Sequence, residues 1–413
     1  MKILYITYDG LLDPLGSSQI LPYLYGINDP SKAIFVISFE KSKLYKKFHK
    51  KLNNELQEKN IYWKPLLFSN QFGLIGKLWD FLKIYIFSIR ITVNKKINIV
   101  HARGHVAAQV AGFLKLFFKV KFIFDFRGLW ADERVDKGGW NLNNIFDKLQ
   151  YRYFKNKEKQ LLMRCDHTIV LTKKVVSEIC KISKIEFDKI TVIPCCADFD
   201  HFTIQTEEKK LNIRQQLKIP KNSIVIGYLG SIGQMYLIND YLKFLDLLHY
   251  EYRKSKQHIY GLIITNDLFN AKNAINQVAS DELKENILVS TASRNEVPKF
   301  LHSLDVLISF ISVTYARQAA SPTKIAESFA TGIPIISNAG VGDVDDQLLS
   351  VHGGLIIEDT SIKNLQETII DLNDVLNLDR MNIRAKAKEF LSLDIAIQRY
   401  KDVYSKVNFR KND

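Results

Sequence analysis

Short apolar runs alternate with longer amphipathic segments along this chain, and the pattern occurs twice. Apolar runs of this length separated by helical segments are typical of parallel sheets with crossover helices. In the first half we expect strands at 2–8, 33–39, 98–102, 121–126, 167–171 and 189–193, and helices at 19–26, 106–118, 143–165 and 173–180. In the second half we expect strands at 224–229, 259–265, 287–289, 306–310, 333–337 and 354–357. The sequence therefore predicts an α/β fold with two Rossmann-like, doubly wound domains.

The domain boundaries follow from length and polarity. A chain of 413 residues is too long for one hydrophobic core. The stretch 198–222 is polar and contains Glu207-Glu208-Lys209-Lys210, so it is the expected linker. We expect a first domain at 1–197, a second at 198–385, and two helices after residue 377 that end near residue 407.

The positive charge is concentrated in the first half. The chain has a net charge of +14; residues 1–200 hold 33 Lys and Arg against 19 Asp and Glu, whereas residues 201–413 hold 25 of each. This asymmetry favours an anionic partner of the first half, such as phospholipid, nucleic acid or an anionic substrate. Lysines at 41, 43, 46, 47, 50 and 51 strengthen it, although such a run is equally typical of a solvated helix face. No nucleic-acid recognition motif is visible, so we expect no nucleic-acid partner.

The start of the chain and its cysteines indicate the cellular compartment. Met1-Lys2 leads directly into the strand pattern 3–6 without the long apolar core of a secretory leader, so we expect a cytoplasmic protein. Four cysteines, at 165, 180, 195 and 196, are too few for a disulfide framework, and we expect reduced, mostly buried thiols.

The segment 72–93 is apolar enough to raise the question of a membrane. Lys77, Asp80, Lys83 and Arg90 interrupt it, and a spanning helix needs about 20 residues with few charges. We expect an amphipathic helix that either packs on the first sheet or lies in a bilayer surface with its aromatic side chains inserted. Together with the neighbouring lysines, this favours a peripheral contact with an anionic membrane at the inner face of the cell membrane.

The segment Ser321–Pro334 combines a helix start with a lysine and a carboxylate. We expect Ser321 to cap the helix, Pro322 to occupy its first position, and Gly332 with Pro334 to end it. The amino end of a helix favours an anion, and Lys324 adds a full charge there. Glu327, one turn further on, can accept hydrogen bonds from sugar hydroxyls. The segment predicts a site for a nucleotide diphosphate; the alternative is a capped helix with both charged side chains in solvent.

Three glycine loops follow strands, where ligands of open parallel sheets collect. The residues expected to bind the donor there are Gly16 and Ser17 after the first strand, Gly230 and Ser231, and Gly340 and Gly342, together with Ser321 and Thr323. None of the loops has the G-x-G-x-x-G spacing of a dinucleotide site. Asp343, Asp345 and Asp346 follow the last loop, but acidic residues there are typical of a helix start, so we expect no metal.

A carboxylate and a guanidinium end the strand at 121–126. Asp125 and Arg127 are candidate catalytic residues with Lys324 and Glu327, because buried charges are costly unless they pair or meet a ligand. The alternative is an internal Asp125–Arg127 ion pair that shapes the loop. The candidates for the acceptor side are His101, Arg103 and Trp130.

Together these segments resemble the retaining GT-B glycosyltransferases of family 4, best the bacterial polysaccharide and capsule enzymes of glycosyltransferase group 1. The likeness rests on three segments in the right order: Phe124–Trp130 resembles their F-E-V-R-D-L-W loop, Val192–Asp200 their I-P-N-G-V-D segment, and Ser321–Glu327 the segment that holds the donor. The resemblance implies a hexosyl-type transfer from a nucleotide diphosphate sugar to a lipid-linked or saccharide acceptor, with retention and without a metal or other cofactor. It also implies a C-terminal helix, here 386–413, that returns to the first domain.

The chain departs from the family in two places. Where many members carry the first glutamate of E-x7-E, this chain has Ala319, and the basic pair after the second-domain glycine loop is replaced within Ser231–Tyr236. Arg317 is a candidate to replace the missing charge. The departures leave open an alternative, a catalytically inactive GT-B partner of another enzyme that binds a saccharide or a membrane.

Overall fold

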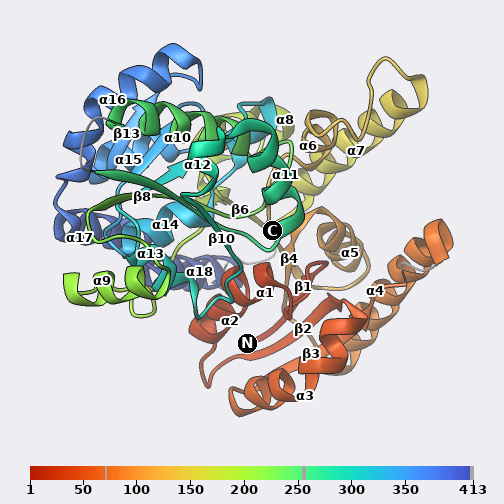
Figure 1. Cartoon of the computed structure of the whole chain (residues 1–413). Coiled ribbons are helices and arrows are strands. Elements are labelled where there is room, and N and C mark those ends of the chain that lie inside the picture. Colours follow the sequence, from red (N-terminus) through yellow and green to blue (C-terminus); the bar gives the residue numbers. More distant parts are fainter. Residues whose placement is uncertain (70–71, 254–256, 410–413) are drawn as a thin grey trace. The chain divides into compact units, whose positions relative to one another are not determined.

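The computed structural model describes all residues of the chain except 70–71, 254–256 and 410–413. The chain forms two compact units (Figure 1). Unit 1 comprises 1–194 and 394–413, and unit 2 comprises 195–393. Each unit is an α/β layer structure in its own right and is described separately.

Within the described residues, unit 1 holds a seven-stranded parallel sheet in the order β3-β2-β1-β4-β5-β6-β7. The strands are β1 (Lys2–Thr7), β2 (Ala33–Glu40), β3 (Ile61–Leu67), β4 (Ile99–Arg103), β5 (Lys121–Asp125), β6 (His167–Val170) and β7 (Ile190–Val192). The helices are α1 (Pro14–Gln19), α2 (Leu21–Ile27), α3 (Ser42–Glu58), α4 (Gly73–Lys95), α5 (Gly104–Phe117), α6 (Trp130–Asp136), α7 (Ile145–Arg164), α8 (Lys174–Ser183) and, from Asp394 onward, α18 (Leu393–Phe409). The central strands are buried except at Lys2 and Lys121, the first residues of β1 and β5, as expected of a sheet covered on both faces.

The edge strand β3 is the strand of unit 1 that the sequence pattern does not indicate. Only Ile61 and Leu66 in it are buried, and Lys64 and Pro65 interrupt its apolar character. Edge strands tolerate proline and charge because one of their sides has no partner strand. An apolar run was therefore the wrong criterion for this strand.

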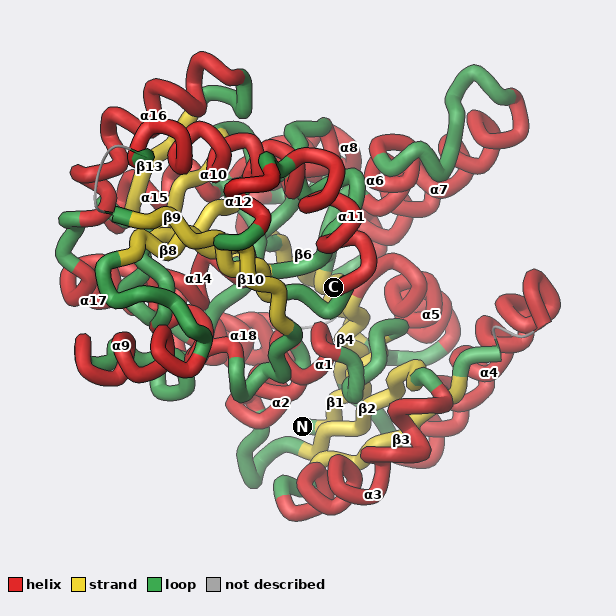
Figure 2. The backbone as a smooth tube through the Cα atoms, in the orientation of Figure 1, coloured by secondary structure: helices red, strands yellow, loops and turns green. Residues whose placement is uncertain are grey.

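Within the described residues, unit 2 holds a six-stranded parallel sheet in the order β10-β9-β8-β11-β12-β13, drawn in yellow between red helices in Figure 2. The strands are β8 (Ser223–Leu229), β9 (His258–Ile264), β10 (Ile287–Ser290), β11 (Val306–Ser309), β12 (Ile335–Asn338) and β13 (Gly354–Ile357). The helices are α9 (Glu207–Gln216), α10 (Ile238–Tyr252), α11 (Leu268–Val278), α12 (Asp281–Lys284), α13 (Val297–His302), η3 (Tyr315–Ala319), α14 (Thr323–Ala330), α15 (Val344–Val351), α16 (Ile362–Leu376) and α17 (Arg380–Leu391). Two apolar clusters, one on each face of the sheet, form its core. The two doubly wound sheets expected from the sequence are confirmed.

The polar stretch 198–222 is not a linker. Phe199, Phe202 and Ile219 are buried in the core of unit 2, and α9 lies between them in the sequence. Arg214 on α9 is also buried, and its guanidinium donates to Asp305 at 2.7 Å. High polarity here reflects the solvent face of α9 and a buried ion pair, so the prediction of a linker was wrong.

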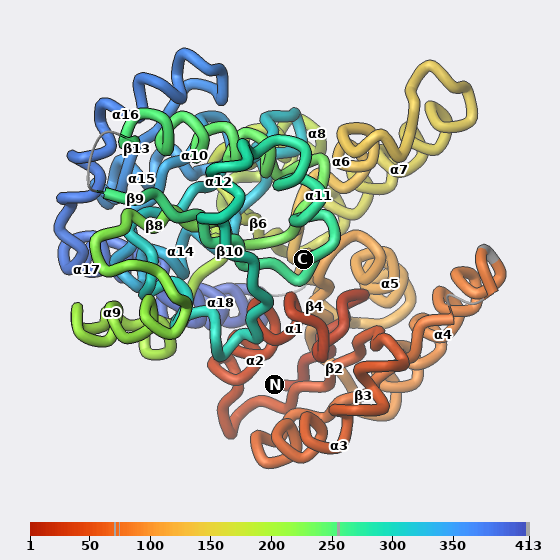
Figure 3. The backbone as a smooth tube through the Cα atoms, in the orientation of Figure 1, coloured from red at the N-terminus to blue at the C-terminus, as the bar shows by residue number. Residues whose placement is uncertain are grey.

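The C-terminal helix belongs to unit 1. Figure 3 shows α18, in blue, beside the red helices α1 and α2, and the rings of Tyr23 on α2 and Tyr400 on α18 are 5.6 Å apart. The chain changes units at 194/195 and 393/394, compared with predicted boundaries at 197/198 and 385/386. Residues 386–391 are therefore not part of the returning helix, because they complete α17 of unit 2.

The four cysteines are free, and three of them, Cys165, Cys195 and Cys196, are buried. Among the described residues no helix is both long and apolar enough to cross a membrane.

Candidate functional site

Both sheets have a topological switch point, the place where consecutive strands leave in opposite directions. It lies between β1 and β4 in unit 1 and between β8 and β11 in unit 2. Ligands of doubly wound folds bind beyond the carboxyl ends of the strands at this point. Functional residues of each unit are therefore expected at these positions.

In unit 2, α14 begins one residue later than a Ser321 cap would place it. Pro322 is the N-cap residue and Thr323 the first helical residue. The hydroxyl of Ser321 instead accepts a hydrogen bond from the Cys195 amide at 3.0 Å. Because no side chain caps α14, its first amides keep their capacity to bind an anion. The predicted end is confirmed, since Thr331 closes the helix and Gly332 has a φ of +70°.

Lys324 is a buried cation without a counter-ion. Its side chain is in the first turn of α14 and its residue is only 7% exposed. The ammonium lies 5.3 Å from the ring centroid of Tyr228 and 5.6 Å from that of Tyr236. Within the part of the chain that the structure describes, Nζ has no hydrogen-bond partner. Burial lowers the pKa of Lys324 to about 8, so the side chain is still mostly charged at neutral pH.

Glu327 lies one turn beyond Lys324 and is partly buried. Burial raises the pKa of Glu327 to about 7, and the nearby Arg294 offsets part of this effect. Arg317, the candidate replacement for the missing basic pair, is 9% exposed in η3, and its Nε has no hydrogen-bond partner among the described residues. Its carbonyl accepts from the Gly342 amide at 2.9 Å, which ties η3 to the loop after β12.

The glycine loops of unit 2 differ in what they offer a ligand. Gly230 has a φ of +132° and no atom within 4 Å of where a Cβ would stand, and Ser231 after it is exposed. The Gly340 amide donates to Asp345 at 3.1 Å and the Gly342 amide to Arg317. The loop after β12 thus uses both glycine amides internally. In the loop after β8 the Gly230 amide donates to the Ile264 carbonyl at 3.0 Å, but the space beside Gly230 and the Ser231 side chain are open to a ligand.

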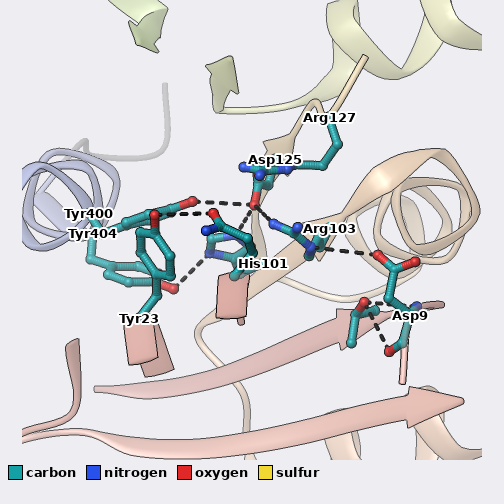
Figure 4. Close-up of polar contacts among 10 residues, drawn as sticks. Asp9, Tyr23, His101, Arg103, Asp125, Arg127, Tyr400 and Tyr404 are labelled. Atoms are coloured by element: carbon teal, nitrogen blue, oxygen red, sulfur yellow. Dashed lines mark hydrogen bonds and ion pairs between the residues drawn. The ribbon is translucent and has the colours of Figure 1, made fainter. Parts of the chain in front are cut away.

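In unit 1, Asp125 is the centre of a buried polar cluster (Figure 4). At the end of β5 it has no exposed surface. The guanidinium groups of Arg103 and Arg127 approach its two carboxylate oxygens at 3.5 and 3.4 Å, and the Tyr400 hydroxyl donates to it at 3.4 Å. His101 Nε2 lies 3.5 Å from Asp125, and His101 Nδ1 pairs with the Tyr404 hydroxyl at 2.7 Å.

The electrostatics of this cluster favour an ionised Asp125. Burial raises the pKa of Asp125, but Arg127, His101 and Arg103 lower it by more, and it ends well below its usual range. Burial also lowers the pKa of His101, which keeps the imidazole neutral. A buried carboxylate that remains ionised is a poor proton acceptor. The geometry therefore gives Asp125 and His101 a positioning role, and the expected Asp125–Arg127 ion pair is present.

The remaining candidates of unit 1 have structural contacts. Gly16 is buried in α1, and a Cβ there would stand 2.1 Å from the Gly10 carbonyl oxygen. The Ser17 hydroxyl donates to the Pro14 carbonyl at 3.0 Å. Trp130 is partly buried against Trp140 and Phe154, with ring centroids 5.6 and 4.9 Å away. Close packing of backbone explains the glycine at position 16.

Sequence reasoning missed four tyrosines. Tyr228 and Tyr236 surround the Lys324 ammonium, and Tyr400 and Tyr404 bring α18 to the Asp125 cluster. The spacing of four between Tyr400 and Tyr404 places both on one face of a helix, which was the available indication. Among the described residues, no group of three or more His, Cys, Asp or Glu side chains is arranged to hold a metal ion.

Two protein families match the sequence, one in each half of the chain. The family described as glycosyl transferases group 1 matches residues 209–389, and the family described as glycosyltransferase family 4 matches residues 50–201. No curated protein matches the sequence.

Several solved structures are similar over nearly their whole length. A glycosyltransferase from Rickettsia africae has a TM-score of 0.71 at 16% identity and covers 99% of both chains. HepE from Anabaena in complex with UDP and glucose has a TM-score of 0.69 at 14% identity, covering 98% of this chain and 99% of its own. Sucrose-phosphate synthase from Thermosynechococcus elongatus has a TM-score of 0.70 at 12% identity, covering 98% and 99%. At these identities the likeness establishes the fold.

Proposed function

The chain belongs to the group 1 glycosyltransferases of the GT4 type, with the two-domain GT-B fold, and we propose that it moves a hexosyl-type sugar from a nucleotide diphosphate sugar to a lipid-linked or saccharide acceptor. The proposed transfer retains the configuration of the anomeric carbon and needs no metal ion. Its proposed setting is cell-surface polysaccharide synthesis at the inner face of the membrane.

The observation that carries this proposal is the buried, unpartnered ammonium of Lys324 at the start of α14. A buried charge is costly unless an anion meets it. The uncapped amides of α14 and the open Gly230–Ser231 loop provide further places for phosphate oxygens. A diphosphate group matches this arrangement in charge, and it is the group that a nucleotide sugar brings.

In the proposed reaction the protein stabilises the negative charge on the leaving diphosphate and does not need to supply a nucleophile. The bond between the anomeric carbon and the diphosphate oxygen breaks, and the acceptor oxygen bonds to the same face of that carbon. The acceptor proton passes to the departing diphosphate, so no protein base is needed. Lys324 and the α14 amides stabilise the charge that develops on the leaving group. Glu327 binds donor hydroxyls, and the basic unit 1 binds the acceptor, with Arg127 positioned by Asp125.

A screen of nucleoside diphosphates and their sugars tests the proposal. One of them should raise the melting temperature, because binding to the native state alone increases apparent stability. UDP-glucose is tried first, since HepE has been solved with it. The same sugar nucleotide should be hydrolysed slowly without an acceptor. Stabilisation without hydrolysis or transfer would favour the inactive binding protein suggested by Ala319, and no stabilisation by any nucleotide would contradict the donor site.

The titration of Lys324 predicts how UDP affinity depends on pH. The free protein loses the ammonium charge as pH rises through about 8, and an anion prefers the protonated form. We therefore expect the Kd for UDP to increase by about tenfold per unit above pH 8, where Glu327, with a pKa of about 7, is already ionised. Calorimetry across this range measures it. Lys324→Arg keeps its charge, so any affinity that it retains should not change over the same range; an unchanged wild-type Kd at pH 9.5 would contradict the role of Lys324.

A further inference from the structure

The long helix α4 of unit 1 is inverted in polarity. The side facing its own unit carries Gly76, Asp80, Ile84, Ser88 and Thr92 at intervals of four, all buried. The outer side carries Ile75, Leu78, Trp79, Leu82, Ile86 and Val93, between 48% and 76% exposed. An ordinary surface helix shows the opposite distribution. The six exposed side chains are called the outer apolar stripe below.

Close backbone contact fixes this orientation of α4. A Cβ at Gly76 would stand 2.0 Å from the Ser69 carbonyl oxygen, so only glycine permits the contact. Asp80 accepts from the Ser69 amide at 3.0 Å and pairs with Lys83 at 2.7 Å. The helix therefore cannot rotate to bury the outer apolar stripe without breaking these contacts.

The outer apolar stripe has apolar neighbours in unit 1. The ring of Tyr85 on α4 contacts Phe113 on α5, and Phe113 contacts Phe117, which is 63% exposed. Burial, and next the hydroxyl of Tyr153 on α7, raise the pKa of Tyr85, so α7 is close by. In Figure 1 the amino-terminal ends of α4 and α7 both extend past the sheet of unit 1 on the same side. The first turns of α7 add the exposed Ile145, Phe146 and Leu149.

The charges around the stripe are positive. The exposed charged residues of α4 are Lys77, Arg90 and Lys95, while its one acidic residue, Asp80, is buried and paired. Lys64 on β3, also exposed, stands over the ring of Phe87 at 4.3 Å. The lysine run on α3 does not belong to this surface: Tyr45 of α3 contacts Trp63, which neighbours Lys64 and so faces the other side of the sheet.

We propose that the outer apolar stripe of α4 is seated in the surface of an anionic lipid bilayer, with the helix in the plane of the membrane and Lys77 and Arg90 at the headgroups. Exposed aliphatic side chains, a tryptophan and neighbouring cations match the acyl boundary and the anionic headgroups together. The exposed charged residues of α4, together with Lys64, are all cations, which favours an anionic surface over a neutral partner. This inference deepens the membrane part of the proposed function by naming the surface that makes the contact.

Flotation with vesicles tests the inference on the full-length protein without nucleotide or acceptor. Wild type should float with vesicles of phosphatidylglycerol and phosphatidylcholine, and much less with phosphatidylcholine alone. Leu78→Glu/Trp79→Glu should reduce the bound fraction by about tenfold, because it replaces two inserted side chains by anions. The matched control, Leu349→Glu/Ile370→Glu, changes two comparably exposed apolar residues of unit 2 and should float like wild type.

A charge variant and two further measurements complete the test. Lys77→Glu/Arg90→Glu should abolish the preference for anionic vesicles while leaving the melting temperature unchanged, because both side chains are exposed. The emission of wild type should shift to the blue on vesicles, and Trp79→Phe should lose this shift. Equal flotation of wild type and Leu78→Glu/Trp79→Glu would overturn the inference. So would a wild-type dimer that this variant dissociates, since a second copy would then cover the stripe. Donor hydrolysis without lipid is measured separately, so a failure here leaves the proposed transferase reaction untouched.

Discussion

Lys324→Met is expected to reduce sugar transfer by about 100-fold to 1,000-fold while making the folded protein more stable. The loss follows from removing the charge that we propose stabilises the leaving diphosphate, and single donors to a developing anion contribute effects of this size. The gain follows from burial, because the wild-type ammonium is 7% exposed and has no hydrogen-bond partner among the described residues. Activity and stability should therefore change in opposite directions.

The size of the stability gain can be bounded. Burial lowers the pKa of Lys324 to about 8, so the charged form is disfavoured in the folded state at every pH below that value. Cation–π contacts with the rings of Tyr228 and Tyr236 offset part of the free-energy cost of burying the ammonium. We expect Lys324→Met to gain about 1–2 kcal/mol near pH 7, measured by urea unfolding of unit 2. This cost is fully present below pH 8 and is lost progressively between the folded-state pKa of about 8 and the ordinary value of 10.5, so the gain should shrink as pH rises from 8 towards 10.5.

Two controls separate this explanation from simple damage to the fold. Lys324→Arg keeps the charge and should retain more activity than Lys324→Met, although a planar guanidinium does not replace an ammonium fully. UDP should raise the melting temperature of wild type and not that of Lys324→Met. A Lys324→Met enzyme with near wild-type turnover, or one that is both inactive and less stable, would remove Lys324 from the leaving-group site.

The positions of most strands were predictable because both sheets are covered on both faces. A parallel strand that is buried on both faces has a nearly continuous apolar run, such as Ile224–Leu229 or Phe122–Phe124, and such runs are recognisable in the sequence. This criterion does not find the edge strand β3 or the polar helix α9. Strand β3 lies at the edge of its sheet, and α9 faces the core of unit 2 with one side only, so both contain many polar residues. In these two segments the polar composition reflects exposure to solvent, and it does not indicate that they lie outside a domain.

The site was predictable only in its local parts. Short-range rules predict a helix at α14, with its start one residue too early, and they place Lys324 in its first turn. The burial of Lys324 does not, because Tyr228 and Tyr236 come from a distant strand and loop. In the same way Asp125 looked like a catalytic group at a strand end, whereas its partner Tyr400 is 275 positions away. Contacts between distant segments decide whether a charged residue meets a substrate or only its own protein.

Asp125→Ala is expected to destabilise unit 1 by about 3–5 kcal/mol, because it leaves the buried guanidinium of Arg103 and the largely buried one of Arg127 without their main counter-ion. Asp9 can compensate only in part, since it lies 3.6 Å from Arg103 Nε and is itself half exposed. Hydrogen exchange by mass spectrometry measures the effect locally. Amides of β4, β5 and α18 should exchange about 100-fold faster or more, while those of β8 and β12 in unit 2 should be unchanged.

Tyr404→Phe is the matched control, since it keeps every charge and removes one hydroxyl. It costs the hydrogen bond to buried His101, about 1 kcal/mol, and should accelerate exchange in α18 by only about fivefold. If the cluster acts as a unit, Asp125→Ala should also loosen α18, because Tyr400 of that helix donates to the missing carboxylate. Fast exchange confined to β4 and β5, with α18 as protected as in wild type, would show that the C-terminal helix is held by its apolar contacts alone. In that case Asp125 would serve only to pair the two arginines.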